Sequence, residues 1–290
     1  LLSLSSADYP KLDELVAGLH AYFHDKHVGL SLPSLRVDRQ LKLLPDVLTS
    51  VRKGGITIAV EAASEKLRRI VNKPLRDEDL FAAVEAAYRA GWQKLKLYFM
   101  VGLPGETLDD VKRIVQLSLE LARLRKTACP EPGRSGTGRA GQINITVSWF
   151  VPKPHTPLAW LGQKPKAYFE QARQLILDTK RRLGVKFLQF KFHDIGRSIL
   201  ESAIGRGDRR LGDVIEAAWR AGAKFDLWDE CFNYELWRSA FEKSGIDVEA
   251  AAQKQFDPVA TLPWEHLGGP DKKYLLGHLE DANEEVSRIS

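Results

Sequence analysis

The sequence predicts an α/β fold built around a parallel β-sheet, either open or barrel-like. Apolar strand-like segments alternate with amphipathic helical segments over roughly the first two thirds of the chain. The strands are apolar nearly throughout, as the strands of buried parallel sheets are. Polar or glycine-rich residues follow five of the strands. Because ligands of parallel α/β folds bind at the carboxyl ends of the strands, this pattern predicts a ligand site along one edge of the sheet.

The expected elements follow one another as strand and helix. The strands are expected at residues 1–5, 28–32, 56–61, 95–101 and 143–150. The helices are expected at residues 9–24, 40–51, 64–71, 77–90, 108–125 and 166–183. Their apolar residues recur with a spacing near 3.6, as at Leu80, Val84, Ala87 and Tyr88. This order implies right-handed crossovers between parallel strands.

The alternation stops near residue 185. Residues 127–141 are rich in glycine, proline and arginine and are expected to form a solvent-exposed loop. One more strand, 186–192, precedes helices with many aromatic residues, whose helical spacing between 219 and 241 predicts core packing rather than a cofactor site. We therefore expect a barrel-like domain at 1–185 and a mostly helical C-terminal extension at 186–290.

The amino-acid composition limits the classes of protein to which this chain can belong. Of 290 residues, 44% are hydrophobic and 28% charged, and no apolar run reaches the ~20 residues of a membrane helix, which predicts a globular protein without a membrane partner. The net charge of +5 mildly favours anionic binding partners. The sequence has two cysteines, Cys129 and Cys231, which lie far apart. So few cysteines exclude a disulfide scaffold and are typical of a protein in a reducing cytoplasm. They also form no self-contained zinc or iron–sulfur motif. The first six residues lack an initiator methionine and read as a strand, which predicts a piece of a longer protein.

The most informative stretch is residues 94–107, Lys-Leu-Lys-Leu-Tyr-Phe-Met-Val-Gly-Leu-Pro-Gly-Glu-Thr. An apolar strand breaks at Gly102, Leu103, Pro104 and Gly105, and a helix begins just beyond. Glycine lets a backbone approach a ligand closely, because no side chain intervenes. Thr107 is a good helix cap, and the acidic residues after it suit the positive end of the helix dipole. The segment therefore predicts one wall of a ligand site.

The other strand ends carry further candidate residues. They are Ser5, Ser6 and Asp8, then Ser31, Pro33, Ser34 and Arg36, then Glu61, Ser64 and Arg68, and finally the run from Val151 to Pro157. Asp8 is equally well explained as a helix cap. Glu61 ends an apolar strand and needs a donor, either Arg68 or a ligand hydroxyl, and a vicinal diol is the partner we favour. His155, between prolines, fits an exposed loop histidine better than a catalytic base.

Taken in order, these strand ends resemble the radical S-adenosylmethionine (SAM) superfamily, and within it a cobalamin-associated, largely uncharacterised branch. The resemblance rests on five stretches from the barrel-like part, at 1–9, 30–38, 59–68, 94–107 and 150–157, and on two later ones, 205–210 and 262–264. It implies a partial (β/α)6 TIM-like barrel that lacks its first strand. In the family that strand leads into a CxxxCxxC loop whose thiolates hold a 4Fe–4S cluster, which binds and cleaves SAM.

The resemblance also implies roles for the residues present. Ser5, Ser6 and Asp8 would lie near the methionine amino group, and Glu61 would hold the ribose hydroxyls. Arg68 would lie near the methionine carboxylate, where a cation suits an anion. Gly102, Leu103 and Pro104 would approach the adenine, and Val151 and Pro152 would close its pocket.

The cysteines depart from the family pattern. Cys129 and Cys231 cannot replace a CxxxCxxC loop, since a cluster requires closely placed thiolates. The sequence therefore predicts a fragment of a radical SAM enzyme that is inactive alone, with the cluster, and cobalamin in this branch, belonging to the longer parent. The alternative is a non-catalytic barrel that binds RNA or a protein, supported by the net charge and by arginine-rich runs at 206–210 and 134–139. An unrelated barrel enzyme using Glu61 and His155 as acid and base ranks last, because no nucleophile–base pair accompanies them.

Overall fold

The computed structural model describes residues 9–26, 28, 55–128 and 139–289. The chain divides into two compact units that interleave along the sequence. The first unit comprises 1–100, 107–148 and 175–192, and the second comprises 101–106, 149–174 and 193–290. The domain boundary expected near residue 185 stays a prediction, and the two units are described separately.

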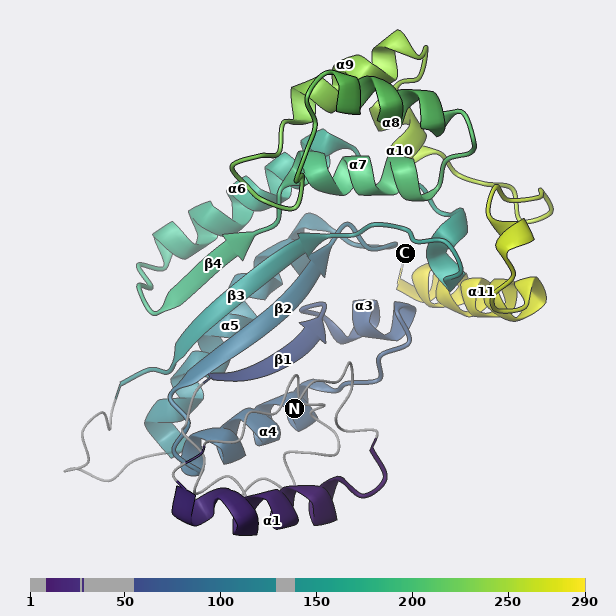
Figure 1. Cartoon of the computed structure of the whole chain (residues 1–290). Helices are drawn as coiled ribbons and strands as arrows, with labels where there is room; N and C mark the ends of the chain where they lie inside the picture. The colour runs from purple at the N-terminus through teal and green to yellow at the C-terminus, as the bar shows by residue number, and fades with distance from the viewer. Residues whose placement is uncertain (1–8, 27, 29–54, 129–138, 290) are drawn as a thin grey trace. The chain divides into compact units, whose positions relative to one another are not determined.

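The first unit contains a parallel four-stranded sheet with the order β1-β2-β3-β4, as Figure 1 shows. Its strands are β1 (Gly55–Glu61), β2 (Lys94–Val101), β3 (Gln142–Trp149) and β4 (Leu188–Phe192). β1 pairs in parallel with β2 from Gly55 opposite Lys94, and β3 pairs in parallel with β4 from Ile143 opposite Leu188. The predicted α/β fold with a parallel sheet is confirmed, and it is compatible with a partial TIM-like barrel.

The strands place their apolar residues on one face of the sheet. In β2 the side chains of Leu95, Leu97 and Phe99 are at most 1% exposed, while Lys96 and Tyr98 between them are exposed. Successive side chains of a strand point to opposite faces, so the alternation gives β2 a buried face and an exposed one. The near-uniform burial expected from its apolar sequence is therefore not seen among the described residues.

Helices follow the strands where the sequence predicts them. The described helices of the first unit are α1 (Leu12–Phe23), the short 3-10 turn η2 (His24–Lys26), α3 (Glu65–Ile70), α4 (Asp77–Arg89) and α5 (Leu108–Ala128). The residues of α6 (Lys166–Arg182) are divided between the two units at residue 175. α4 and α5 pack against each other. α5 continues three residues beyond its expected end at 125. The expected strands 1–5 and 28–32 lie outside the described residues apart from Val28, as do helix 40–51 and most of the loop 127–141.

The second unit is mostly helical, as predicted for the C-terminal extension. Beyond η4 (Pro157–Trp160), it contains α7 (Ile195–Gly205), α8 (Leu211–Arg220), α9 (Tyr234–Lys243), α10 (Val248–Gln253), η5 (Glu265–Leu267) and α11 (Lys272–Ile289). α7 packs against α10 and α9, and α11 packs against η4. Asp194, Asn233 and Asp247 cap α7, α9 and α10 by accepting hydrogen bonds from backbone N–H groups. No helix among the described residues is long and apolar enough to span a membrane.

The aromatic residues between 219 and 241 do not all pack in the core. Trp237 and Phe241 on α9 are buried, as expected, but Trp219, Phe225 and Trp228 are 58%, 74% and 62% exposed. The prediction assumed continuous helical spacing. α8 ends at Arg220, however, and turns and bends fill most of the stretch before α9. The prediction of core packing was therefore wrong for these three residues.

Candidate functional site

The carboxyl end of β1 carries Glu61 in a left-handed backbone conformation, with φ of 68°. The register between β1 and β2 shifts just before it, so that Glu61 pairs with Phe99. Glu61 Oε1 accepts a hydrogen bond from Lys73 Nζ at 2.9 Å, and the same ammonium donates to the carbonyl oxygen of Ala59. The Glu61 side chain is 28% exposed, and no described residue donates a hydrogen bond to its second oxygen. A half-exposed carboxylate is thus held in place with one oxygen open to a further donor.

Lys73 was missed by the sequence analysis, which considered only Arg68 and a ligand as donors to Glu61. It lies twelve residues after Glu61, in the turn Asn72-Lys73-Pro74 beyond α3. A lysine in a turn that follows a short helix can reach back to the strand before that helix, and this placement is the signal that could have indicated it. The carboxylate at the end of the strand is therefore paired without help from Arg68.

Arg68 is instead completely buried within the first unit, at 0% exposed. Its Nε donates to the carbonyl oxygen of Leu75 at 2.7 Å, its Nη1 donates to that of Ala62 at 3.0 Å, and its Nη2 pairs with Asp77. Arg69, on the neighbouring helix face, is exposed. Each guanidinium nitrogen of Arg68 has a protein acceptor, so the guanidinium fixes the segment between α3 and α4. Its expected contact with the methionine carboxylate stays a prediction.

The carboxyl end of β2 turns sharply at Gly102, which has φ of 101°. Its backbone N–H donates to Glu106 Oε1 at 2.7 Å, and the Tyr168 hydroxyl donates to the same oxygen at 2.6 Å. A Cβ at Gly102 would lie 2.6 Å from the Phe169 ring. The sequence predicts a close backbone approach here, and the approach in the structure is to this phenylalanine. Leu103 is fully buried.

The start of α5 is held by a reciprocal cap within the first unit. The Asp110 backbone N–H donates to Thr107 Oγ1 at 3.4 Å, and Asp110 Oδ2 accepts from the Thr107 N–H at 2.9 Å. Lys66 forms an ion pair with the same carboxylate at 2.8 Å. Burial raises the pKa of Asp110, but the bonds from Lys66 and Thr107 outweigh it and leave the pKa below its usual value. The cap expected at Thr107 is confirmed, and Asp110 and Lys66 complete it.

The segment after β3 belongs to the second unit. The Phe150 N–H donates to the carbonyl oxygen of Val101 at 2.8 Å, which joins the ends of β2 and β3. Pro152 is buried and Val151 is half-buried. His155 has φ of 59° and is half-buried rather than exposed. The interpretation of His155 as an exposed loop histidine is therefore not supported.

Several predicted residues lie outside the part of the chain that the structure describes. They are Ser5, Ser6, Asp8, Ser31, Pro33, Ser34, Arg36 and Cys129. Within the described part, no group of three or more His, Cys, Asp or Glu side chains could hold a metal ion, and Cys231 is a free, exposed thiol. Two cysteines in the whole sequence do not fit a 4Fe–4S cluster, which needs three protein thiolates in this family.

The arginine run at 206–210 is largely engaged within the second unit. Arg206 is 2% exposed and donates to the carbonyl oxygens of Ala252 and Lys254 at 3.1 and 2.6 Å. Arg210 forms an ion pair with Asp208 at 2.8 Å, and hydrogen bonds from Arg210 lower the Asp208 pKa to about 2. Because a buried guanidinium cannot contact phosphates, this run offers less positive surface to RNA than its sequence suggests.

Comparison with known families finds a match for the first part of the chain. Residues 3–118 match the Radical SAM superfamily. The matched stretch includes β1, β2, Glu61 and the turn at Gly102. β1, β2 and the glycine turn after β2 thus lie in the stretch that matches the superfamily, and the resemblance inferred from the strand ends is confirmed at the level of the superfamily.

Two archaeal proteins are similar over more of the chain. Uncharacterized protein MJ0966 of Methanocaldococcus jannaschii is 27% identical over 217 residues, which are 74% of this chain and 43% of that protein. Uncharacterized protein MK0932 of Methanopyrus kandleri is 29% identical over 176 residues, 61% of this chain and 30% of that protein. The matched part of the chain thus spans less than half the length of the curated relatives.

Proposed function

We propose that this chain is the SAM-binding part of a longer radical SAM enzyme. The observation that carries the proposal is the superfamily match over residues 3–118. The matched parts of this chain cover 43% and 30% of two uncharacterized archaeal relatives, which is why we propose a longer parent protein. A parallel sheet whose carboxyl ends bear a carboxylate and a glycine turn is the expected scaffold for such a ligand.

The proposed ligand contacts follow the chemistry of each residue. Glu61 accepts from the ribose hydroxyls with the oxygen that Lys73 leaves open. Gly102, Leu103, Pro104, Val151 and Pro152 are the proposed adenine contacts. Leu103 is fully buried and Pro152 buried, so these two shape the pocket from behind, whereas the half-buried Pro104 and Val151 have surface to offer a ring.

The methionine end of the ligand is assigned to Ser5, Ser6, Asp8 and Arg68. All three guanidinium nitrogens of Arg68 already have protein acceptors, so a ligand carboxylate would have to replace one of them. Lys73 is a second cation in the same segment, and its side chain is 35% exposed. We therefore add Lys73 to the proposed set as the cation better placed to meet an anionic group.

The cluster is assigned to the parent protein, and the isolated chain is proposed to be inactive. When bound elsewhere in the parent, a 4Fe–4S cluster would supply the electron that cleaves SAM. The residues of this chain would hold and orient the nucleoside. Cobalamin, a cytoplasmic location and the methylation-type or rearrangement reactions of the related branch remain proposals for the parent.

Binding of S-adenosylhomocysteine, an unreactive analogue that retains the nucleoside, tests the ligand site. We expect saturable binding to the 290-residue chain by isothermal titration calorimetry. Glu61→Gln is expected to weaken it about tenfold or more, because a hydrogen bond to a charged group contributes roughly 1.5–3 kcal/mol. Glu78→Gln, an exposed glutamate on α4, is the matched control and is expected to bind like the wild type. Equal affinity in the two variants would show that Glu61 does not contact the ligand.

Anaerobic reconstitution with iron and sulfide tests the placement of the cluster. The chain alone is expected to develop no absorption of a 4Fe–4S cluster, while the longer parent protein is expected to develop it. A cluster on the chain alone would contradict the argument from its two cysteines. The absence of a cluster from the parent would refute the proposed enzyme class.

A further inference from the structure

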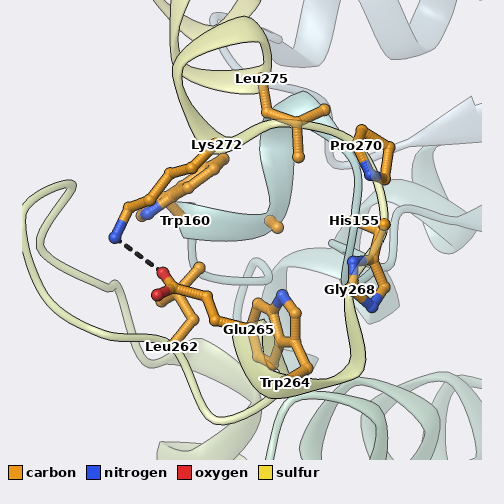
Figure 2. A pocket seen from close by; sticks show the side chains of 11 residues that line it. His155, Trp160, Leu262, Trp264, Glu265, Gly268, Pro270, Lys272 and Leu275 are labelled. Atoms are coloured by element: carbon orange, nitrogen blue, oxygen red, sulfur yellow. Dashed lines mark hydrogen bonds and ion pairs between the residues drawn. The ribbon is translucent and has the colours of Figure 1, made fainter.

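A cavity of about 230 Å³ lies within the second unit, lined by residues of η4, η5 and the start of α11 (Figure 2). Its apolar walls come from one buried core cluster, which includes Trp160, Trp264, Leu262 and Leu275. Lys272 Nζ donates to Glu265 Oε1 at 2.7 Å, the pair that the dashed line marks in Figure 2, and a backbone hydrogen bond from Leu262 also holds this carboxylate. The charged groups that line the cavity are thus paired with each other and select no ligand by charge.

A different apolar region of the second unit faces solvent. It is the loop between α8 and α9 (Figure 1), in which Phe225, Leu227 and Trp228 are 74%, 90% and 62% exposed. We call these three side chains the loop patch. Apolar side chains left in water forgo the free energy that their burial would contribute. Because three large ones are exposed within four residues, rather than singly, the loop patch has the character of an interaction surface.

The loop is anchored by its own carboxylates. Asp226 Oδ1 accepts a hydrogen bond from the indole N–H of Trp237 on α9 at 3.2 Å. Asp229 forms an ion pair with Arg197 of α7 at 2.9 Å. The polar side chains therefore hold the loop against the neighbouring helices, while the apolar side chains between them stay in solvent.

The backbone of the loop is also fixed. The Trp228 N–H donates to the carbonyl oxygen of Phe225 at 2.9 Å, and the Cys231 N–H donates to that of Trp228 at 3.0 Å. Phe225 has φ of 57°, a left-handed conformation that a bulky residue adopts only at a cost in free energy. Strained residues of this kind persist where the surrounding structure enforces them, and they are common at binding sites. The exposure of the loop patch is thus built into the fold.

The surroundings of the loop patch are acidic. Residues 213–230 carry five carboxylates and two cations, a net charge of −3: Asp213, Glu216, Asp226, Asp229 and Glu230 against Arg220 and Lys224. Including Arg197, which pairs with Asp229, still leaves −2. The whole chain carries +5, so this region has the opposite sign to the rest of the protein. Negative charge disfavours the phosphates of nucleic acids and of anionic lipids, and it favours a cationic partner.

We propose that the loop patch docks a segment of a partner polypeptide that is apolar and positively charged. Tryptophan is among the residues that contribute most to binding at interfaces, and Trp228 is the largest side chain of the patch. A loop that is already fixed loses little conformational freedom on binding, which favours affinity. Charge complementarity selects a basic partner over an acidic one. The proposal concerns the second unit alone and does not depend on the proposed SAM site.

A synthetic amphipathic helix of leucine and lysine, with the leucines along one face, is the probe. The labelled peptide is titrated with the 290-residue chain and followed by fluorescence anisotropy. We expect saturable binding that weakens as the salt concentration rises, because salt screens exposed charges. A peptide with the same leucines but glutamate in place of lysine is expected to bind at least about tenfold more weakly, since its charges repel the acidic surroundings.

Variants of the chain locate the binding. Trp228→Ala is expected to weaken binding of the leucine–lysine peptide about tenfold or more. Leu227→Ala, at a side chain that is 90% exposed, weakens binding in the same direction without disturbing the core. Tyr274→Ala is the matched control, because Tyr274 is an aromatic residue of the second unit with a similar exposure, 61%, but lies on α11. Peptide affinity is expected to be unchanged in this variant.

Several results would overturn the proposal. Absence of saturable binding, or equal affinity for the two peptides, would refute a basic partner. Equal affinity in Trp228→Ala and Tyr274→Ala would place the binding elsewhere on the chain. A dimer in sedimentation velocity that Leu227→Ala abolishes would assign the loop patch to a second copy of this chain. Binding to phosphatidylcholine vesicles that the same variant abolishes would assign it to a membrane surface.

Discussion

Replacing Arg68 by methionine should unfold the first unit at much lower denaturant concentration. The Arg68 side chain is 0% exposed and hydrogen-bonds to the carbonyl oxygens of Ala62 and Leu75 as well as to Asp77. Methionine fills much of the same volume but donates nothing. The substitution therefore leaves two buried carbonyl groups without this donor and breaks an ion pair.

The magnitude follows from these contacts. A buried acceptor left without a partner costs about 1–3 kcal/mol. Asp77 is 31% exposed and keeps Arg113 at 3.6 Å, so the loss of its ion pair adds no more than ~1 kcal/mol. The two carbonyl groups together give about 2–6 kcal/mol, so the free energy of unfolding should fall by about 2–7 kcal/mol.

The measurement is urea denaturation, combined with hydrogen-exchange mass spectrometry of α3 and α4. Arg69→Met, at the exposed neighbour on α3, is the control and should change the unfolding free energy by less than about 0.5 kcal/mol. A difference below ~1 kcal/mol between the two variants would refute the structural role of Arg68. Unchanged exchange in Arg68→Met together with lost affinity for S-adenosylhomocysteine would show that Arg68 serves the ligand instead.

Two further predictions concern the turn after β2 and the start of α5. Gly102→Ala should lower the unfolding free energy by about 2–4 kcal/mol, because it combines a strained backbone with a clash against Phe169. Gly222 also has a positive φ, 108°, but has open space around it. Gly222→Ala is therefore the control and should lower the unfolding free energy by only about 1–2 kcal/mol in the same denaturation assay. Asp110→Asn should remove a stabilisation that depends on pH. Because the folded pKa of Asp110 lies below 3.8, this stabilisation is present above that pH and is lost as the pH falls through the folded pKa. The stability difference between wild type and Asp110→Asn should therefore be constant near neutral pH and shrink below about pH 4; a difference that does not change with pH would show that the Lys66 pair contributes nothing.

Much of the fold could be predicted from the sequence because its signals are local. The apolar run before Gly102 and the helical spacing at Leu80, Val84 and Ala87 reflect periods that a strand and a helix each impose on their own residues. The expected strands at 56–61, 95–101, 143–150 and 186–192 all match β1 to β4 within two residues. Thr107 was recognised as a cap because its partner lies only three residues away.

Longer-range pairings could not be predicted. The partner of Glu61 is Lys73, and the space beside Gly102 is filled by Phe169, which lies 67 residues further along the chain. The exposure of Trp219 and Trp228 depends on where α8 ends and on how the chain then turns toward α9. Neither residue type nor spacing specifies such contacts, because many arrangements satisfy the same pattern.

The sequence by itself pointed to the superfamily that residues 3–118 match. An order of strand ends that includes Glu61 and Gly102 was enough to indicate a radical SAM domain, and a count of two cysteines was enough to show that this chain contains no cluster loop. Chain order and composition are properties of the sequence alone. Only the tertiary structure decided that Arg68 is enclosed by protein acceptors and that Trp264, Glu265 and Lys272 surround one cavity. Packing brings together groups from separate elements, and the desolvation that fixes their roles exists only once those elements have met.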